Sequence, residues 1–141
     1  MGTLTTKLSI RSSNVSRNRI SQRHDRLFNV EDRIDNGVRV IKTNSINSPT
    51  TIADGAEYYD SGESGDLANQ VYLFIRNVSK TYKKTITVVF NKNGTRDDVA
   101  LLNNGEFIFM PWKCDAATDK VEVFSNDTAG VKIEYLISPM R

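Results

Sequence analysis

The sequence contains one cysteine, Cys114, and one histidine, His24, among its 141 residues. A single thiol cannot close a disulfide within the chain, and these two residues are too few for a Cys/His metal site. We therefore expect no metal and no cofactor. Apolar runs are also short, and residues 71–75 fall far below the roughly 20 residues that span a bilayer. We expect no membrane segment.

Charge and aromatic residues are distributed unevenly along the chain. Residues 1–26 carry six cations against Asp25 alone, a net charge of +5, whereas the remaining 115 residues sum to −3. Eleven of the twelve aromatic residues lie at or after Tyr58, so the core is expected in the C-terminal part. We interpret residues 1–36 as an extended basic N-terminal arm and residues 37–141 as one folded domain.

The first part of the chain predicts little regular structure. Residues 4–10 and 38–43 alternate as short strands do, and the second run follows the turn signal Asn36-Gly37. Between them, the spacing of Leu27, Val30 and Ile34 allows one short helix. Small polar residues at 44–51 and 60–66 are typical of loops.

From residue 70 onward the pattern is regular and rich in Val, Ile, Phe, Tyr and Thr, which favour strands. The predicted strands are residues 70–77, 85–91, 99–102, 106–110, 120–124 and 131–137. Turn signals separate them at intervals of about ten residues. Together they predict an all-β fold, an antiparallel β-sandwich similar to a jelly roll.

The segment LLNNGEFIFMPW at residues 101–112 carries an unusual amount of apolar area. Asn104-Gly105 predicts a tight hairpin turn, after which Phe107 and Phe109 alternate with Ile108 and Met110 on opposite faces of a strand. Because both faces are apolar, we expect both to be buried. One side packs into the sandwich, and the other needs a cover from the arm, from a loop or from another subunit.

Two residues end this segment. Pro111 has no N–H to donate and is expected to end the strand. Trp112, the only tryptophan, is either a plug for the end of the sandwich or an anchor at an interface with a partner.

No residue pattern indicates catalysis. Ser21, His24 and Asp25 have the side chains of a nucleophilic triad but lie in an Arg-rich stretch without a rigid scaffold. Cys114 is interpreted as a small packing residue. The acidic residues of the loop after Tyr58 lack EF-hand spacing and are expected to be solvated rather than to hold Ca²⁺; they are Glu57, Asp60, Glu63 and Asp66. We predict that the protein is not an enzyme.

The basic arm is the feature that indicates a binding function, and it has two interpretations. Nucleic-acid binding is disfavoured because no aromatic residue interleaves the arginines and the folded part is net acidic. Binding along another protein is favoured, with burial of apolar side chains at roughly 1.5 to 3 kcal/mol each; these are Leu4, Leu8, Ile10, Val15 and Ile20. Exposed ion pairs alone return about 0.2 to 1 kcal/mol each, too little to offset the roughly 1 to 2 kcal/mol of backbone entropy per ordered residue.

Two sets of motifs resemble a known family. The first is TLTTKLSI at residues 3–10 with VRVIKTN at 38–44; the second is VYLFIRN at 71–77, TITVVF at 85–90, NGEFIFMP at 104–111 and VKIEY at 131–135. With these motifs the chain resembles small virion structural proteins of tailed bacteriophages, especially those of marine cyanobacterial hosts. The resemblance implies a β-sandwich in the virion, often trimeric and without catalytic activity.

This resemblance and the arm together predict a capsid decoration or cement protein that binds the major capsid protein or other virion proteins. The expected partner contacts are Leu4, Leu8, Ile10, Arg11, Arg17, Arg19, Arg23, Arg26 and Trp112. One alternative is a tail, neck or fibre-attachment protein. Another is a carbohydrate-binding sandwich in which Tyr58, Tyr59 and Trp112 form a sugar platform.

Overall fold

The computed structural model describes residues 2–12, 20–30, 35–62 and 68–139, and nearly all of its regular structure is β-strand. The elements are β1 (Gly2–Ser12), β2 (Ile20–Val30), β3 (Asp35–Ile41), β4 (Thr50–Asp54), α1 (Gly55–Tyr58), β5 (Gln70–Asn77), β6 (Ile86–Lys92), β7 (Thr95–Leu102), β8 (Phe107–Lys113), β9 (Lys120–Ser125) and β10 (Val131–Pro139). The predicted all-β class is confirmed. In the described part of the chain, no helix is long and apolar enough to cross a membrane.

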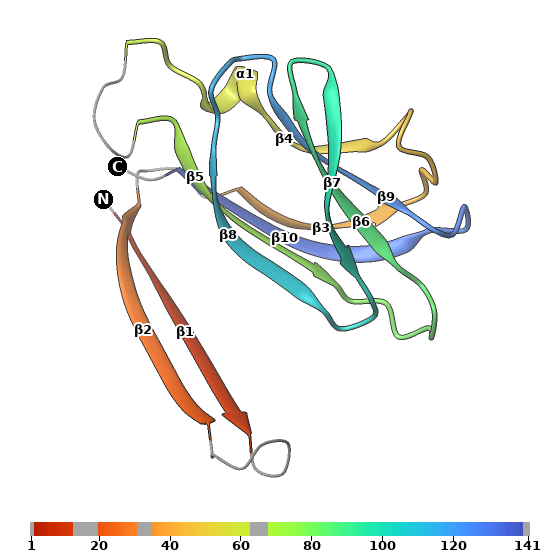
Figure 1. Cartoon of the computed structure of the whole chain (residues 1–141), viewed down its shortest axis with the longest axis horizontal. Coiled ribbons are helices and arrows are strands. Elements are labelled where there is room, and N and C mark those ends of the chain that lie inside the picture. Colours follow the sequence, from red (N-terminus) through yellow and green to blue (C-terminus); the bar gives the residue numbers. More distant parts are fainter. Residues whose placement is uncertain (1, 13–19, 31–34, 63–67, 140–141) are drawn as a thin grey trace.

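Eight of the strands form two four-stranded sheets that face each other (Figure 1). One sheet has the order β3-β10-β5-β8, and the other has the order β4-β9-β6-β7. Every neighbouring pair is antiparallel. The prediction of two packed antiparallel sheets is therefore confirmed.

The core lies between these two sheets and is built from alternate residues of their strands. In β5, Val71, Leu73 and Ile75 are buried at 1% exposure or less, and their β10 neighbours alternate in the same way. The other sheet contributes equally buried β-branched residues from β6 and β9, which are Ile86, Val88, Val121 and Val123. Side chains on one face of each strand thus fill the interior, as the period of two in the sequence requires.

The loop predicted to be a hairpin turn instead joins the two sheets. β7 pairs with β6, whereas β8 pairs with β5, so Asn104 and Gly105 lead the chain from one sheet to the other. Gly105 has a φ of +84°, which suits glycine. By contrast, Asn93 and Gly94 form a true two-residue hairpin between β6 and β7, with φ values of +50° and +91°.

The prediction that Pro111 ends its strand is wrong. Pro111 pairs with Tyr72 inside the ladder, and β8 continues to Lys113. β8 is the edge strand of its sheet, so no strand lies on one side of it. An edge strand tolerates proline because an N–H on its open side is not needed for pairing.

The N-terminal part also differs from the sequence prediction. Leu27 and Val30 lie in β2, a strand rather than a short helix, and β2 pairs over its full length with β1. Asn36 and Gly37 lie inside β3, which pairs with β10, so they form no turn. The residues predicted as loop near Thr50 begin β4. Ile34 lies outside the described residues.

Candidate interaction surface

The β1–β2 hairpin has one apolar face and one polar face. The register pairs Leu4 with Phe28, Leu8 with His24 and Ile10 with Gln22, so all even-numbered residues of the two strands share a face. This even face carries Leu4, Leu8, Ile10, Ile20, Phe28 and Val30, along with Thr6, Ser12, Gln22, His24 and Arg26. We call it the apolar hairpin face.

The odd-numbered residues form the opposite, polar hairpin face. Here Thr5 pairs with Leu27, Lys7 with Asp25, and Ser9 with Arg23. Thr5 and Lys7 are both exposed. Apart from Leu27, this face carries hydroxyl, amide and charged residues, and therefore suits water or a polar surface.

The six predicted arm contacts that fall in the hairpin are divided between these two faces. Leu4, Leu8 and Ile10 share the apolar hairpin face with Arg26, whereas Arg11 and Arg23 lie on the polar hairpin face. Arg17 and Arg19 lie outside the described residues. The sequence analysis had predicted a strand only at residues 4–10 of the arm, so it did not separate these groups.

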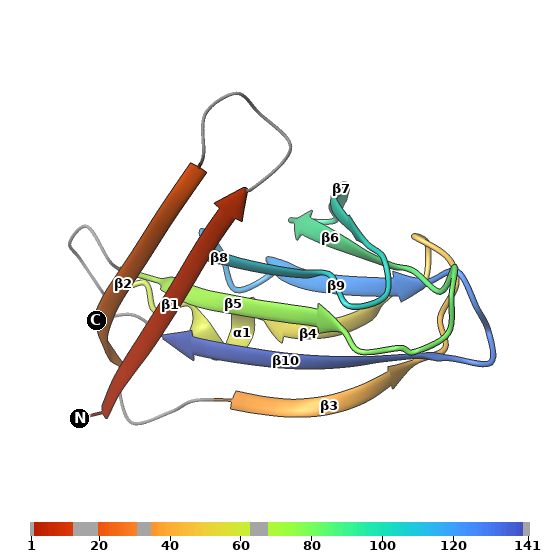
Figure 2. The same cartoon turned by 90° about the horizontal axis from the view of Figure 1, so that it is seen from below.

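The hairpin extends away from the sandwich. Within the described ranges, β1 and β2 pair with each other and with no strand of either four-stranded sheet. Figure 1 shows the hairpin leaving one end of the sandwich, and Figure 2 shows it on the same side as the outer surface of the β3-β10-β5-β8 sheet. An isolated two-stranded hairpin is at best marginally stable in water, so the apolar hairpin face needs a partner surface.

The outer surface of the β3-β10-β5-β8 sheet is also apolar. Of the described residues, the large apolar ones exposed on it are Val38 (57%), Val40 (55%), Phe107 (51%) and Phe109 (37%). Between them lie the half-buried Phe74 and Leu136, which the register places next to Phe109 and Asn36. We call these six residues the outer sheet patch.

Aromatic rings connect the strands of this patch. Tyr72 and Phe109 stack with a centroid distance of 5.3 Å and an interplanar angle of 7°. Phe74 and Phe107 lie 5.9 Å apart in a tilted arrangement. Both ring pairs are diagonal cross-strand neighbours, and contacts of this kind stabilise a sheet.

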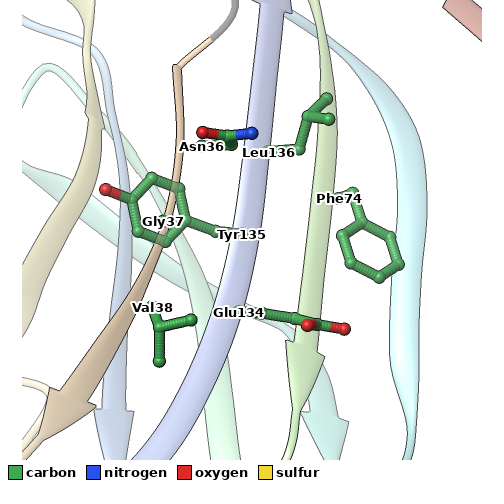
Figure 3. A pocket seen from close by; sticks show the side chains of 7 residues that line it. All are labelled: Asn36, Gly37, Val38, Phe74, Glu134, Tyr135 and Leu136. Atoms are coloured by element: carbon green, nitrogen blue, oxygen red, sulfur yellow. The ribbon is translucent and has the colours of Figure 1, made fainter.

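One ion pair crosses the patch, and a shallow depression lies beside it. Arg76 Nη1 approaches Glu134 Oε1 at 3.4 Å. Figure 3 shows Glu134 and Val38 among the side chains that line the depression, which has a volume of about 390 Å³. Gly37 lies over the ring of Tyr135, and a Cβ at this position would come within 2.9 Å of the Tyr135 hydroxyl oxygen. The glycine therefore lets the Tyr135 ring pack against β3.

The prediction that β8 is buried on both faces is corrected in part. Ile108 and Met110 pack against the core, whereas Phe107 and Phe109 keep substantial exposure on the outer surface. The sequence analysis expected another segment or another subunit to cover this second face of β8. Within the described part of the chain, no segment covers it. The sequence of β5 likewise has large apolar residues on both faces, because Tyr72 and Phe74 alternate with core residues. The sequence analysis did not use this pattern.

The burial of Trp112 favours the first of its two predicted roles, a plug, over an anchor at an interface. It is 3% exposed and belongs to the core, beside its β5 neighbour Val71. Its ring is therefore not on the surface for a partner or a sugar. Tyr58 and Tyr59 pack against the same core, and the Tyr58 hydroxyl donates to Asp35 Oδ2 at 2.5 Å. The three aromatic residues do not form an exposed platform.

The residues that the sequence analysis considered for catalysis or metal binding do not form a site in the described part of the chain. Cys114 is fully buried, and this burial raises the pKa of its thiol to about 11. Glu57 lies in α1, Asp60 is an exposed residue beyond it, and Glu63 and Asp66 lie outside the described residues. No cluster of three or more His, Cys, Asp or Glu side chains suited to a metal occurs in the part of the chain that the structure describes.

A buried carboxylate that the sequence did not predict lies on the other sheet. Glu122 is 3% exposed on β9, and its Oε2 accepts hydrogen bonds from Arg96 Nε at 2.8 Å and from Asn91 Nδ2 at 3.3 Å. The hydrogen bond to Glu122 raises the pKa of Arg96. With a cation and an amide on one oxygen, Glu122 is a partnered structural group rather than a reactive one.

The fold and surface define a two-sheet antiparallel β-protein with a projecting amphipathic hairpin. Comparison of the chain with family models, with curated proteins and with solved structures finds no match.

Proposed function

We propose that this protein is a non-enzymatic structural component of a bacteriophage particle, and more specifically a capsid decoration or cement protein. In this proposal the sandwich sits on the shell, and the β1–β2 hairpin reaches neighbouring subunits, including the major capsid protein. The observation that carries the proposal is the hairpin itself, which extends from the sandwich with an apolar face that needs a partner surface.

The order of the strands supports this class of protein. With β3 to β10 taken as eight consecutive strands, the sheets β3-β10-β5-β8 and β4-β9-β6-β7 have the interleaved order expected of a jelly roll. Jelly rolls occur in viral capsid proteins and in lectins. Because one fold serves many functions, the strand order supports the proposal only in combination with the hairpin.

The charges of the hairpin suit attachment to an acidic shell. Lys7, Arg11 and Arg23 lie on the polar hairpin face, which is free to contact a different protein from the one that covers the apolar face. Such rim contacts contribute mainly to orientation and rate of association, whereas apolar burial contributes most of the affinity. Each copy would connect adjacent shell subunits and resist pressure from packaged DNA.

A tail, neck or fibre-attachment protein is the second candidate from the same class of particle, and the same hairpin favours it equally. The number of copies separates the two. Hundreds of copies per particle indicate a shell protein, whereas six or twelve indicate the tail or neck. A carbohydrate-binding module is less well supported, because Trp112 is buried in the core.

The direct experiment is quantitative mass spectrometry of purified particles of the phage that carries this gene. The proposal expects the chain in the particle at a copy number comparable with that of the major capsid protein. A chain that is abundant in infected cells but absent from washed particles would refute a structural role. The shell location fails separately if the chain is present at only six or twelve copies.

A further inference from the structure

We infer that the apolar hairpin face of one copy covers the outer sheet patch of a second copy, so that two chains exchange their hairpins about a two-fold axis. The inference rests on the part of the proposed function that makes the hairpin the docking element. It goes further because it names the surface that receives the hairpin and the chain that supplies that surface.

The donor and the acceptor have matching chemistry. The donor face carries Leu4, Leu8 and Ile10 from β1, with Ile20, Phe28 and Val30 from β2. The acceptor carries two exposed valines and two exposed phenylalanines on an otherwise well-packed sheet. Each of these surfaces is unfavourable in water, and contact between them removes apolar area from water on both sides.

The dimensions also match. Two strands of eleven residues form a ribbon roughly 35 Å long and 10 Å wide at the usual rise and spacing. Four strands of seven to nine residues provide an outer surface of roughly 25 Å by 15 to 20 Å, so most of the ribbon can lie on it.

The buried area favours a reciprocal arrangement. A ribbon about 10 Å wide overlaps a sheet about 25 Å long over roughly 250 Å², which is roughly 500 Å² when both surfaces are counted. A single contact is therefore far smaller than a typical specific interface, whereas two exchanged hairpins reach about 1,000 Å², roughly the size that a specific interface needs. The hairpin lies on the same side of the molecule as the outer surface of the sheet that would receive it, as a two-fold pair requires (Figure 2).

In this arrangement each face of the hairpin contacts a different protein. The apolar hairpin face is covered by the second copy, and the polar hairpin face with Lys7, Arg11 and Arg23 points away from that contact. A pair of chains would then present two cationic ribbons to the shell, and the avidity of the two linked contacts would supply the affinity that a single set of surface charges lacks.

The inference is tested with the full chain in solution by light scattering and sedimentation, and with two matched pairs of variants. Wild type is expected at twice the chain mass of 15.9 kDa. Leu8→Lys places a charge on the apolar hairpin face, whereas Leu27→Lys places the same charge on the polar hairpin face. We expect Leu8→Lys to weaken association by at least about 30-fold, the loss typical of a hot-spot residue, and Leu27→Lys to leave it unchanged.

The second pair of variants tests the acceptor. Val38→Lys combined with Phe107→Lys alters the outer sheet patch, and Leu101→Lys alters an equally exposed residue, 59% exposed, on the edge of the other sheet. The double variant is expected to be monomeric with an unchanged circular dichroism spectrum, and Leu101→Lys is expected to remain dimeric.

Mixing distinguishes hairpin-to-sheet contact from other contacts. The Leu8→Lys chain keeps a normal acceptor, and the Val38→Lys/Phe107→Lys chain keeps a normal hairpin, so a mixture of the two is expected to associate more strongly than either variant alone, although more weakly than wild type, through one hairpin. A monomeric wild type, a trimer, or a mixture that associates no more strongly than either variant alone would each overturn the two-fold exchange. Copy number in particles is independent of these results, so failure of this inference and failure of the proposed function are distinguishable.

Discussion

The rings of Tyr72 and Phe109 stack across β5 and β8, with their centroids 5.3 Å apart and their planes within 7° of parallel. Tyr72 is buried although it lies on the outer surface of the sheet, and Phe109 keeps 37% exposure. One ring therefore shields the other from water at the edge of the outer sheet patch.

Phe109→Ala should destabilise the fold by about 2 kcal/mol, because it removes both the stacked pair and the buried part of the Phe109 ring. The free energy of unfolding is measured in urea at equal protein concentrations, since exchange of hairpins would make it depend on concentration. Leu101→Ala is the control, because Leu101 is 59% exposed. An effect no larger than that of the control would show that the stacking contributes nothing to stability.

Gly55→Ala should destabilise the fold by about 3 kcal/mol, near the upper end of overpacking effects. A Cβ on Gly55 would lie 2.5 Å from the carbonyl oxygens of both Ala116 and Asp119, and backbone atoms cannot easily move away. Thermal unfolding of the variant measures the loss. Gly62→Ala is the matched control, because its Cβ would meet only the Asp60 carboxylate, at 3.2 Å. Equal melting temperatures for the two variants would contradict the packing around α1.

Cys114 should not react with thiol reagents at pH 8 while the protein is folded. Burial raises the pKa of its thiol from 9.0 to about 11, so very little thiolate forms at that pH, and the sulfur is fully buried. The rate of alkylation should therefore rise sharply in denaturant. Rapid alkylation of native protein would show that the turn around Cys114 opens.

The same thiol predicts a loss of stability at high pH. The unfolded thiol ionises near 9.0, whereas the folded thiol ionises near 11, so the unfolded state releases the proton first. The contribution of the protonated, buried thiol to the free energy of unfolding is fully present below pH 9 and is lost as the pH rises to 11. Cys114→Ala should remove this part of the alkaline decrease in melting temperature.

Asp127→Asn should slightly lower the melting temperature at pH 7, and this effect should shrink as the pH falls below 3.8. Lys84 Nζ lies 2.9 Å from Asp127 Oδ2, and this hydrogen bond, with that from the Ala129 N–H, holds the pKa of Asp127 below its ordinary 3.8. The stabilisation is present above pH 3.8 and is lost as the pH falls through the lower folded pKa. Asp97→Asn, at an exposed position, controls for net charge. A difference from wild type that is undiminished at pH 2 would exclude this ion pair as its cause.

The strands after residue 70 could be predicted from the sequence because their signal is local. Alternation of Val71, Leu73 and Ile75 with more polar or aromatic residues needs only the geometry of one strand, and Asn93-Gly94 identifies a hairpin by its own backbone preferences. The N-terminal strand of the hairpin, β1, was recognised in the same way. Its partner β2 was missed, because its alternating apolar residues are interrupted by His24 and Arg26.

The outer sheet patch could be predicted only in part. Phe107 and Phe109 were recognised as a second apolar face of their strand, but Val38 and Leu136 lie nearly one hundred residues apart in the chain and meet on one surface only because β3 pairs with β10. Sequence pattern shows which side of a strand is apolar, but not which strand lies beside it.

By itself the sequence determined that the chain is all-β, where most strands lie, and that its first part is basic, because these properties follow from composition and a period of two. Only the tertiary structure decided that Asn104 and Gly105 carry the chain between sheets, that Pro111 occupies an edge, and that Trp112 is buried while Phe107 is not. These outcomes depend on which distant strands pair, and that choice is made by the packing of the whole core rather than by any single segment.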